Sequence, residues 1–148
     1  MTENLRVTKY NDGSAISLDT SAVTWKTTRR TPKYCFYKNT TNPDSIRRYG
    51  AIYNWAAAYT KNIAPTGWHV PSDAEWDTLQ NSLIAKGYDW DGTIGGEKIA
   101  KSMAAKTDWL PSPYNGTIGC DLSKNNRSGF SALPGGYRDS NGDFGGQG

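Results

Sequence analysis

Apolar residues recur at helical spacing in short stretches of the chain, and polar segments rich in glycine and proline separate these stretches. Ile52, Trp55 and Tyr59 follow one another at intervals of three and four residues. Such spacing places side chains on one face of a helix and predicts a helix over residues 47–59. We expect this face to pack against the rest of the protein.

A second helix is predicted over residues 73–86. Ser72 stands where an N-cap is expected, and Glu75 follows three residues later, which together predict a capping box. Gly87 follows the last helical position and is typical of a helix end. The apolar face of this helix consists of Trp76, Leu79 and Leu83.

The remaining pattern predicts short strands and turns. Residues 34–37 (YCFY) and residues 130–134 (FSALP) indicate strands, and Asn141-Gly142 is a hairpin signal with only Phe144 left to begin a returning strand. A short helix is expected within residues 97–105.

Composition narrows the class of protein. The 148 residues fit a single domain, and a mean hydropathy of −0.72 with 6 Trp and 9 Tyr indicates a polar chain with an aromatic core. The net charge is only +3 and the basic residues are scattered, so we expect no nucleic-acid partner. No apolar stretch is long enough for membrane insertion.

Cysteine and histidine offer little catalytic chemistry. Cys35 and Cys120 could form one disulfide in an oxidising compartment, or could equally be two small buried residues. His69 is the only histidine, with no recognisable nucleophile motif beside it, and we expect it to be packed or hydrogen-bonded near the helix entrance. One histidine and two distant cysteines do not form a recognisable zinc site.

Several motifs together resemble a known family. The chain closely resembles the Fibrobacter succinogenes major paralogous domain, found in surface proteins and lipoproteins of Bacteroidetes and Fibrobacteres, over nearly its whole length. The motifs that carry the resemblance are residues 4–6 (NLR), 9–13 (KYNDG), 34–37 (YCFY), 49–55 (YGAIYNW), 65–76 (PTGWHVPSDAEW) and 129–138 (GFSALPGGYR).

The resemblance implies an α+β, C-type-lectin-like fold, in which two main helices pack on a small, mostly antiparallel sheet. This fold is related to formylglycine-generating and sulfatase-modifying domains. Family members usually continue past a glycine-rich stretch like residues 145–148 into two further strands, so we expect residues 1–148 to be one domain that lacks its last strands. Ala64 stands where many members carry a cysteine. The copper-binding cysteine pair of the formylglycine-generating relatives has no matching motif.

Calcium is the one cofactor for which the sequence offers candidate ligands. Asp139, Asn141 and Asp143 alternate around a glycine and could turn three oxygens toward one ion. The alternative is a hairpin turn that uses the same residues structurally. A second acidic loop, open to the same two interpretations, contains Asp89, Asp91 and Glu97.

Loop aromatics are the candidate glycan-binding residues. Sugar rings stack on aromatic faces while polar groups supply directed hydrogen bonds. Trp90, Trp109 and Tyr114 lie in polar loop segments, and Arg138 is the basic residue we add to this predicted site. The tryptophans expected in the core instead are Trp55, Trp68 and Trp76.

These features favour a non-enzymatic interaction or adhesion module, secreted or on the cell surface as part of a longer exported protein. Its partner would be a glycan or a surface protein. One alternative is an enzyme of the formylglycine-generating kind, which would need a reactive cysteine. Another is a scaffold whose variable loops bind diverse proteins.

Overall fold

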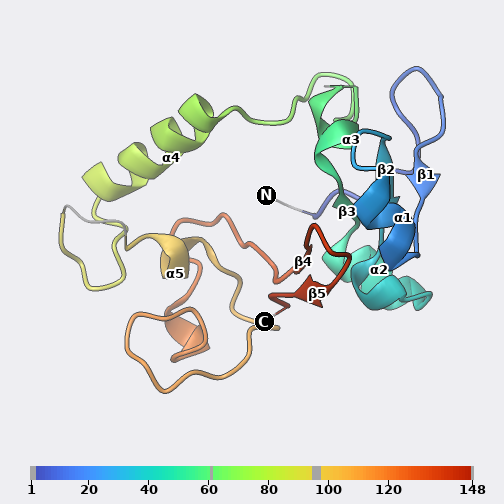
Figure 1. The fold of residues 1–148 in the computed structure, drawn as a ribbon. Coiled ribbons are helices and arrows are strands. Elements are labelled where there is room, and N and C mark those ends of the chain that lie inside the picture. The colour runs from blue at the N-terminus through green and yellow to red at the C-terminus, as the bar shows by residue number, and fades with distance from the viewer. Residues whose placement is uncertain (1–2, 61, 95–97, 148) are drawn as a thin grey trace. The chain divides into compact units, whose positions relative to one another are not determined.

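The structure, a computed structural model, describes residues 3–60, 62–94 and 98–147. Contacts within the chain divide it into two compact units, which we call the sheet unit and the loop unit (Figure 1). The sheet unit consists of Glu3–Val70 together with Gly135–Gln147, and the loop unit is Pro71–Pro134. Gly135–Gln147 therefore belong to the unit that residues 3–70 build.

A three-stranded sheet organises the sheet unit. Its strands are β1 (Ser17–Leu18), β2 (Lys33–Cys35) and β3 (Ile52–Tyr53), with β2 parallel to β1 and antiparallel to β3. All three residues of β2 are buried. The predicted buried strand is thus confirmed in its first half, whereas Tyr37 begins the 3-10 helix η1 (Tyr37–Asn39).

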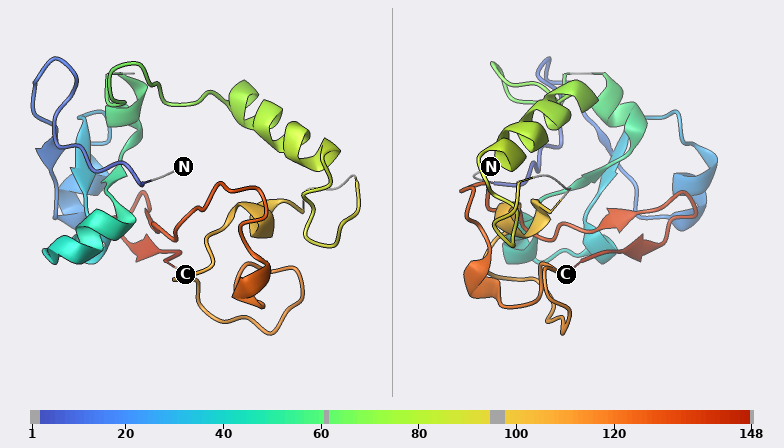
Figure 2. Two further views of the ribbon diagram at one scale, coloured as in Figure 1. Left: turned by 180° about the vertical axis from the view of Figure 1, so that it is seen from behind. Right: turned by 90° about the vertical axis from the view of Figure 1, so that its left-hand side faces the viewer.

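A second, two-stranded sheet contains β4 (Tyr137–Arg138) and β5 (Phe144–Gly145), which pair antiparallel. The hairpin predicted at Asn141-Gly142 is confirmed, and its returning strand begins at Phe144. Both views of Figure 2 show this hairpin beside the first strands and helices of the same unit. A hydrogen bond from Trp25 Nε1 to the Asp139 carbonyl, 3.0 Å long, joins the two parts.

The helices of the sheet unit are short and each begins at a side-chain cap. They are α1 (Ala22–Thr27), α2 (Pro43–Tyr49) and α3 (Trp55–Tyr59). Ser21, Asn42 and Asn54 are their N-caps, and each accepts hydrogen bonds from backbone N–H groups of the first turn.

The single helix predicted over residues 47–59 is therefore wrong. Gly50 ends α2 with a φ of +73°, a left-handed conformation that glycine adopts without steric cost. The chain then forms β3 before Asn54 starts α3. The glycine that ends α2 and the asparagine that caps α3 are local signals, and the apolar spacing alone does not reveal them.

A small core holds the sheet unit together. Ile16, Tyr34, Ala57 and Ile63 form its buried centre. Partly buried apolar residues from the N-terminal segment and from β3 pack against it, among them Leu5, Val7 and Tyr53. The core thus joins the sheet to α3 and to the segment that follows it.

The loop unit contains α4 (Asp73–Ala85), α5 (Ala100–Met103) and the 3-10 helix η2 (Leu122–Lys124). The predicted helix over residues 73–86 and its capping box are confirmed. Ser72 Oγ accepts from the Glu75 backbone N–H, and Glu75 Oε2 accepts from the Ser72 N–H at 2.8 Å.

Two shorter predictions in the loop unit are only partly matched. The helix expected within residues 97–105 is α5, and residues 95–97 lie outside the described part of the chain. The strand expected over residues 130–134 is reduced to one parallel bridge between Ala104 and Ala132. Ala132 also donates its N–H to the Met103 carbonyl, so this segment pairs over too short a length to form a strand.

The expectation that three tryptophans build the core is wrong. Trp55 and Trp68 each expose 76 % of their surface, and Trp76 is also exposed although its ring lies 6.0 Å from that of Phe130. Trp55 is the first residue of α3, whose buried position is Ala57. Ala57 therefore occupies the packed face of α3, and the large Trp55 side chain points to solvent.

The protein is a small α/β molecule with five α-helices and two small sheets in the described ranges, and antiparallel pairing predominates. This agrees with the predicted mixture of helices and short strands. Cys35 is fully buried in β2, Cys120 is partly exposed, and both are free thiols. The structure therefore shows no disulfide between the two cysteines. Only Cys35 matches the other alternative, a small buried residue.

Candidate functional site

The residues expected to bind ligand fall in different units. Trp90, Trp109 and Tyr114 belong to the loop unit, whereas Arg138 and residues 139–143 belong to the sheet unit. Each group is therefore described within its own unit.

Trp90 and the loop that carries Tyr114 come together in the loop unit. Trp90 is 40 % exposed, and its indole packs so closely over Gly116 that a Cβ there would lie 2.5 Å from the ring. Tyr114 is 73 % exposed. Trp109 instead donates its Nε1–H to the Ala132 carbonyl at 3.3 Å. The first two thus present aromatic surface to solvent.

Arg138 has a structural position. It is buried, and its guanidinium lies between the rings of Trp25 and Phe144, 4.6 and 4.8 Å from their centroids. It donates from Nε to the Gly142 carbonyl at 3.0 Å and from Nη1 to the Asp19 carbonyl at 2.7 Å. These contacts fix the hairpin against the rest of the sheet unit.

The candidate calcium residues form a hairpin turn. Asp139 Oδ1 accepts hydrogen bonds from the N–H groups of Asn141, at 2.8 Å, and Asp143, at 3.0 Å. These backbone bonds, that of Asp143 foremost, lower the pKa of Asp139 below its usual value. The Asp139 Oδ1 atom is thus directed toward backbone donors, and calcium binding by this turn stays a prediction.

The second acidic loop also uses its carboxylates internally. Asp91 Oδ2 pairs with Lys98 Nζ at 2.7 Å, while its Oδ1 accepts from the Thr93 N–H and hydroxyl. Asp89 is buried and accepts from the Lys98 N–H, and Glu97 lies outside the described residues. Across residues 3–60, 62–94 and 98–147, no three His, Cys, Asp or Glu side chains gather as a metal site would require.

A cleft with a volume of about 350 Å³ lies in the sheet unit between η1 and α2. We call it the tyrosine cleft. Its lining residues are Tyr37, Lys38, Thr40, Ser45, Tyr49, Gly50 and Gln147.

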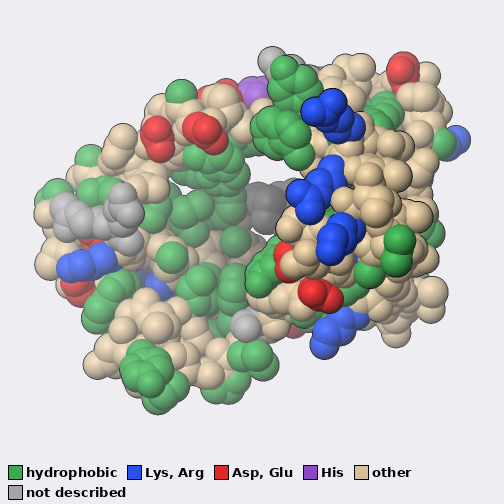
Figure 3. Space-filling view, viewed as in Figure 1, with side chains coloured by type: hydrophobic (Ala, Val, Ile, Leu, Met, Phe, Trp, Pro, Cys, Tyr) green, Lys and Arg blue, Asp and Glu red, His purple; other side chains and the backbone are tan. Residues whose placement is uncertain are grey.

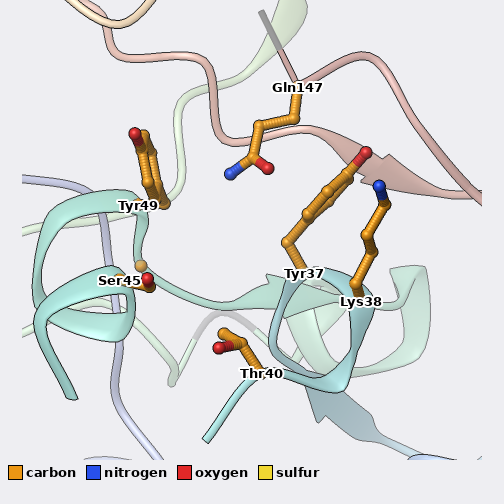
Figure 4. Close-up of a pocket in the computed structure, with 7 residues that line it drawn as sticks. Tyr37, Lys38, Thr40, Ser45, Tyr49 and Gln147 are labelled. Atoms are coloured by element: carbon orange, nitrogen blue, oxygen red, sulfur yellow. The ribbon is translucent and has the colours of Figure 1, made fainter. Parts of the chain in front are cut away.

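The side chains of the tyrosine cleft surround a common space. In Figure 4 the rings of Tyr37 and Tyr49 stand on opposite sides, and the Gln147 amide lies between them. Ser45 and Thr40 lie on the side of the cleft away from Gln147. Aromatic walls and polar groups capable of hydrogen bonding thus face one small volume.

An unusual backbone turn shapes the η1 side of the cleft. Lys38 and Asn39 have φ values of +49° and +54°, a left-handed conformation that costs non-glycine residues energy. Asn39 Nδ2 donates to the Thr20 carbonyl at 3.0 Å, which helps to hold the turn. Strained backbone of this kind is concentrated at functional sites in proteins.

The Tyr37 ring is held by the C-terminal hairpin. It meets the ring of Phe144 edge to face, with centroids 5.6 Å apart. A Cβ at Gly136 would lie 2.5 Å from the Tyr37 ring, so only glycine allows this approach. The wall of the cleft therefore depends on β4 and β5 although Tyr37 is a hundred residues earlier in the chain.

The α2 side of the cleft is fixed by close packing at the helix end. A Cβ at Gly50 would lie 2.6 Å from the Leu5 carbonyl oxygen, and Asn4 Nδ2 donates to the Tyr49 carbonyl at 2.9 Å. The N-terminal segment thus holds the last turn of α2, which carries Tyr49.

The tyrosine cleft offers both stacking faces and hydrogen-bonding groups. Two phenol rings offer stacking faces, and hydroxyl, amide and ammonium groups offer hydrogen bonds. Among the described residues that line it, none is a carboxylate or an imidazole, the groups most often used as general acids and bases.

Sequence reasoning missed the tyrosine cleft. Tyr37 was expected within a buried strand and Tyr49 within a predicted helix. The Asn42-Pro43 pair, which starts α2 as cap and first helical residue, was a signal that a new element begins there. No signal in the sequence brings Gln147 to these residues.

The chain is thus a small α/β protein with a polar, aromatic-walled surface site. In the described ranges, no helix is long and apolar enough to span a bilayer. Its family is shown by sequence: the chain matches the Fibrobacter succinogenes major domain over residues 1–148 and belongs to that family. This confirms the resemblance described above. No curated protein and no solved structure matches the chain.

Proposed function

We propose that the protein is a non-enzymatic interaction module that binds a glycan in the tyrosine cleft. The observation that carries the proposal is the convergence of Tyr37, Tyr49 and Gln147 around one volume large enough for a sugar unit. Stacking of a sugar on a phenol ring, with amide and hydroxyl groups at its edge, is a common mode of carbohydrate recognition.

A C-type-lectin-like fold and a place on an exported or surface protein are part of the same proposal. The support is that the chain belongs to the family. The resemblance described above implies a C-type-lectin-like fold and occurrence in surface proteins and lipoproteins. The mixture of short helices and small, mainly antiparallel sheets is compatible with such a fold. A single domain over residues 1–148 also remains part of this proposal.

The rival enzyme would need a reactive cysteine, and the environment of Cys35 argues against that role. Burial raises the pKa of the Cys35 thiol, and this effect outweighs the opposing influence of Arg138. A thiol that stays protonated in a closed environment is a poor nucleophile. This argues against Cys35 as the reactive cysteine of such an enzyme.

Calorimetry against a panel of soluble plant and host oligosaccharides tests the proposal. Tyr49→Ala and Gln147→Ala each remove one lining group of the cleft and should weaken binding about tenfold or more. Tyr114→Ala is the matched control, because it removes an exposed tyrosine in the loop unit.

The control also distinguishes glycan binding in the tyrosine cleft from glycan binding by the loop aromatics. If Tyr114→Ala or Trp90→Ala abolishes binding while the cleft variants bind normally, the loop aromatics first predicted from the sequence form the site instead. If the folded protein binds no glycan of the panel, the proposed function fails.

A further inference from the structure

A second hollow of the sheet unit lies between the start of α3 and the turn of the β4–β5 hairpin. Its volume is about 250 Å³. We call it the tryptophan hollow. No residue that lines it also lines the tyrosine cleft, so the two are built from different parts of the same unit. Its lining residues include Trp55, Asn54, Arg29, Arg138, Asp139 and Ser140.

Trp55 gives the tryptophan hollow an exposed aromatic wall. The residue exposes 76 % of its surface, and Tyr59, one turn further along α3, is exposed as well. Their rings lie 5.6 Å apart and form one apolar platform. Asn54 caps the helix that carries both rings, because its Oδ1 accepts from the Ala57 N–H at 3.0 Å. A fixed aromatic surface of this kind is suited to stacking with a ligand.

Exposure alone does not distinguish Trp55. Trp68 exposes the same fraction of its surface, yet it lines neither the tyrosine cleft nor the tryptophan hollow. Figure 3 likewise shows several hydrophobic side chains at the surface of the sheet unit on the face in view. The special feature of Trp55 is that polar groups with unused hydrogen-bonding capacity line the same hollow.

These polar groups belong to Arg29 and Asp139. Arg29 donates from Nε to the Lys26 carbonyl at 3.1 Å and from Nη2 to the Ser140 carbonyl at 3.3 Å. Its Nη1 has no partner among the described residues. Asp139 accepts the bonds of the hairpin turn at Oδ1, and in the described part of the chain its Oδ2 accepts none. A donor and an acceptor therefore remain for a ligand.

The charges that line the hollow favour a neutral, hydroxylated ligand. A cation, which aromatic walls attract, would meet the guanidinium groups of Arg29 and Arg138. An anion would meet the carboxylate of Asp139. A hydroxyl group both donates and accepts, so the hydroxyls of a sugar match the free donor and the free acceptor without adding charge.

We infer that the tryptophan hollow is a second glycan site, which binds a neutral hexose unit stacked on Trp55. Hydroxyls of the sugar accept from the Arg29 guanidinium and donate to the Asp139 carboxylate. The inference goes beyond the proposed function, since it rests on residues that the tyrosine cleft does not use. A chain with both sites is bivalent, and a polysaccharide that reaches both gains affinity through avidity.

Calorimetry of the full chain in a Tyr49→Ala background tests the second site, because this change weakens the tyrosine cleft. The ligands are trisaccharides of glucose, mannose and galactose, each compared with the corresponding uronic-acid trisaccharide. We expect at least one neutral trisaccharide to bind, and more tightly than its acidic counterpart. Trp55→Ala should then weaken binding about tenfold or more, whereas Trp55→Phe, which keeps a ring, should retain most of it.

Two further variants check the residues. Arg29→Met keeps the apolar stem and removes the guanidinium, so it should weaken binding about tenfold. Trp68→Ala is the matched control, because Trp68 is as exposed as Trp55 and belongs to the same unit. In ¹⁵N-labelled protein the indole N–H signal of Trp55, identified by its absence from Trp55→Phe, should shift when the sugar is added.

The outcomes separate this site from the tyrosine cleft. The second site is overturned if Tyr49→Ala binds no neutral trisaccharide, or if Trp55→Ala and Trp68→Ala weaken binding equally. Tighter binding of the uronic-acid forms overturns the neutral ligand. Failure of the proposed function looks different: Tyr49→Ala and Gln147→Ala then bind as the parent protein does, while Trp55→Ala alone loses the sugar.

Discussion

Each unit of the protein buries a lysine, and the two units stabilise the buried charge differently. In the sheet unit, Lys33 Nζ pairs with Asp19 Oδ2 at 2.8 Å and donates to the Thr24 carbonyl at 2.6 Å. In the loop unit, Lys101 Nζ points at Asn125 Oδ1, 2.8 Å away, and at backbone carbonyls. These carbonyls belong to Thr117, Ile118, Cys120 and Asp121.

The difference shows two solutions to one problem. A buried charge is costly unless it is paired or fully hydrogen-bonded. Lys33 meets a counter-charge, whereas Lys101 meets a group of neutral oxygens that outnumber its three N–H donors. Such a group of oxygens resembles the surroundings of a hard cation, so the Lys101 ammonium orders residues 117–125 as a bound ion would.

The largest expected effect is that of Lys101→Met. The variant keeps an apolar side chain of similar length but removes up to three charge-assisted hydrogen bonds of about 1.5–3 kcal/mol each, and we expect it to lower the free energy of unfolding by roughly 4 kcal/mol. Urea denaturation measures the loss, and hydrogen exchange at residues 117–125 locates it. Lys98→Met, at an exposed pair with Asp91, should change little. Similar losses in both variants would contradict a special role for Lys101.

Lys33→Met should have a smaller effect, about 3 kcal/mol, because it leaves the mostly buried Asp19 carboxylate without its counter-charge. Asp19 still accepts hydrogen bonds from the Ser21 N–H and the Thr24 hydroxyl, which limits the loss. Adding Asp19→Asn to Lys33→Met should restore part of the stability, as measured by urea denaturation. A double variant weaker than either single variant would argue against the ion pair.

Acid should affect the two lysine sites differently. Burial by itself raises the pKa of Asp19, but hydrogen bonds from Lys33 and Thr24 outweigh it and hold the pKa below 3.8. Its contribution to stability is therefore fully present above the unfolded-state pKa and is lost as the pH falls through the lower folded-state pKa. Between pH 5 and pH 2, Asp19→Asn should flatten the decline in stability.

The measurement for this third prediction is the melting temperature of the protein and of Asp19→Asn across that pH range, followed by circular dichroism. Lys101→Met should leave the slope unchanged, because no carboxylate hydrogen-bonds to Lys101 Nζ in the described part of the chain. A change of slope in Lys101→Met, or none in Asp19→Asn, would remove the distinction between the two sites.

The smallest expected effect is rescue by an added cation. Lys101→Ala leaves the oxygens of residues 117–125 without their ammonium, and K⁺, Na⁺ or methylammonium should then stabilise the variant by about 1 kcal/mol at fivefold excess over the dissociation constant. Differential scanning fluorimetry detects the shift, and Lys33→Ala serves as the comparison. Equal shifts in both variants would indicate a general salt effect.

Local elements of the fold could be predicted where the sequence signal spans only a few neighbouring residues. The capping box of Ser72 and Glu75, the end of α4 near Gly87 and the hairpin at Asn141-Gly142 each depend on interactions within a few residues. The helix predicted over residues 47–59 failed because apolar spacing carries no information about the turn at Gly50.

Burial and the candidate site were harder to predict. Trp55 has the spacing of a core residue, yet Ala57 occupies the packed position of α3. Arg138 was expected in a ligand site and instead lies buried between two rings. In both cases part of the deciding environment comes from distant parts of the chain: Ile16 and Tyr34 for Ala57, and Trp25 for Arg138.

The sequence by itself determined the family, the caps and turns, and the stock of aromatic and polar side chains, because these depend on residue identity and on neighbours close in the chain. Only the tertiary structure decided that Tyr37, Tyr49 and Gln147 enclose one cleft and that Lys101 meets the oxygens of residues 117–125. Such contacts form when distant segments pack around a common core, and no short-range preference specifies which residues then meet.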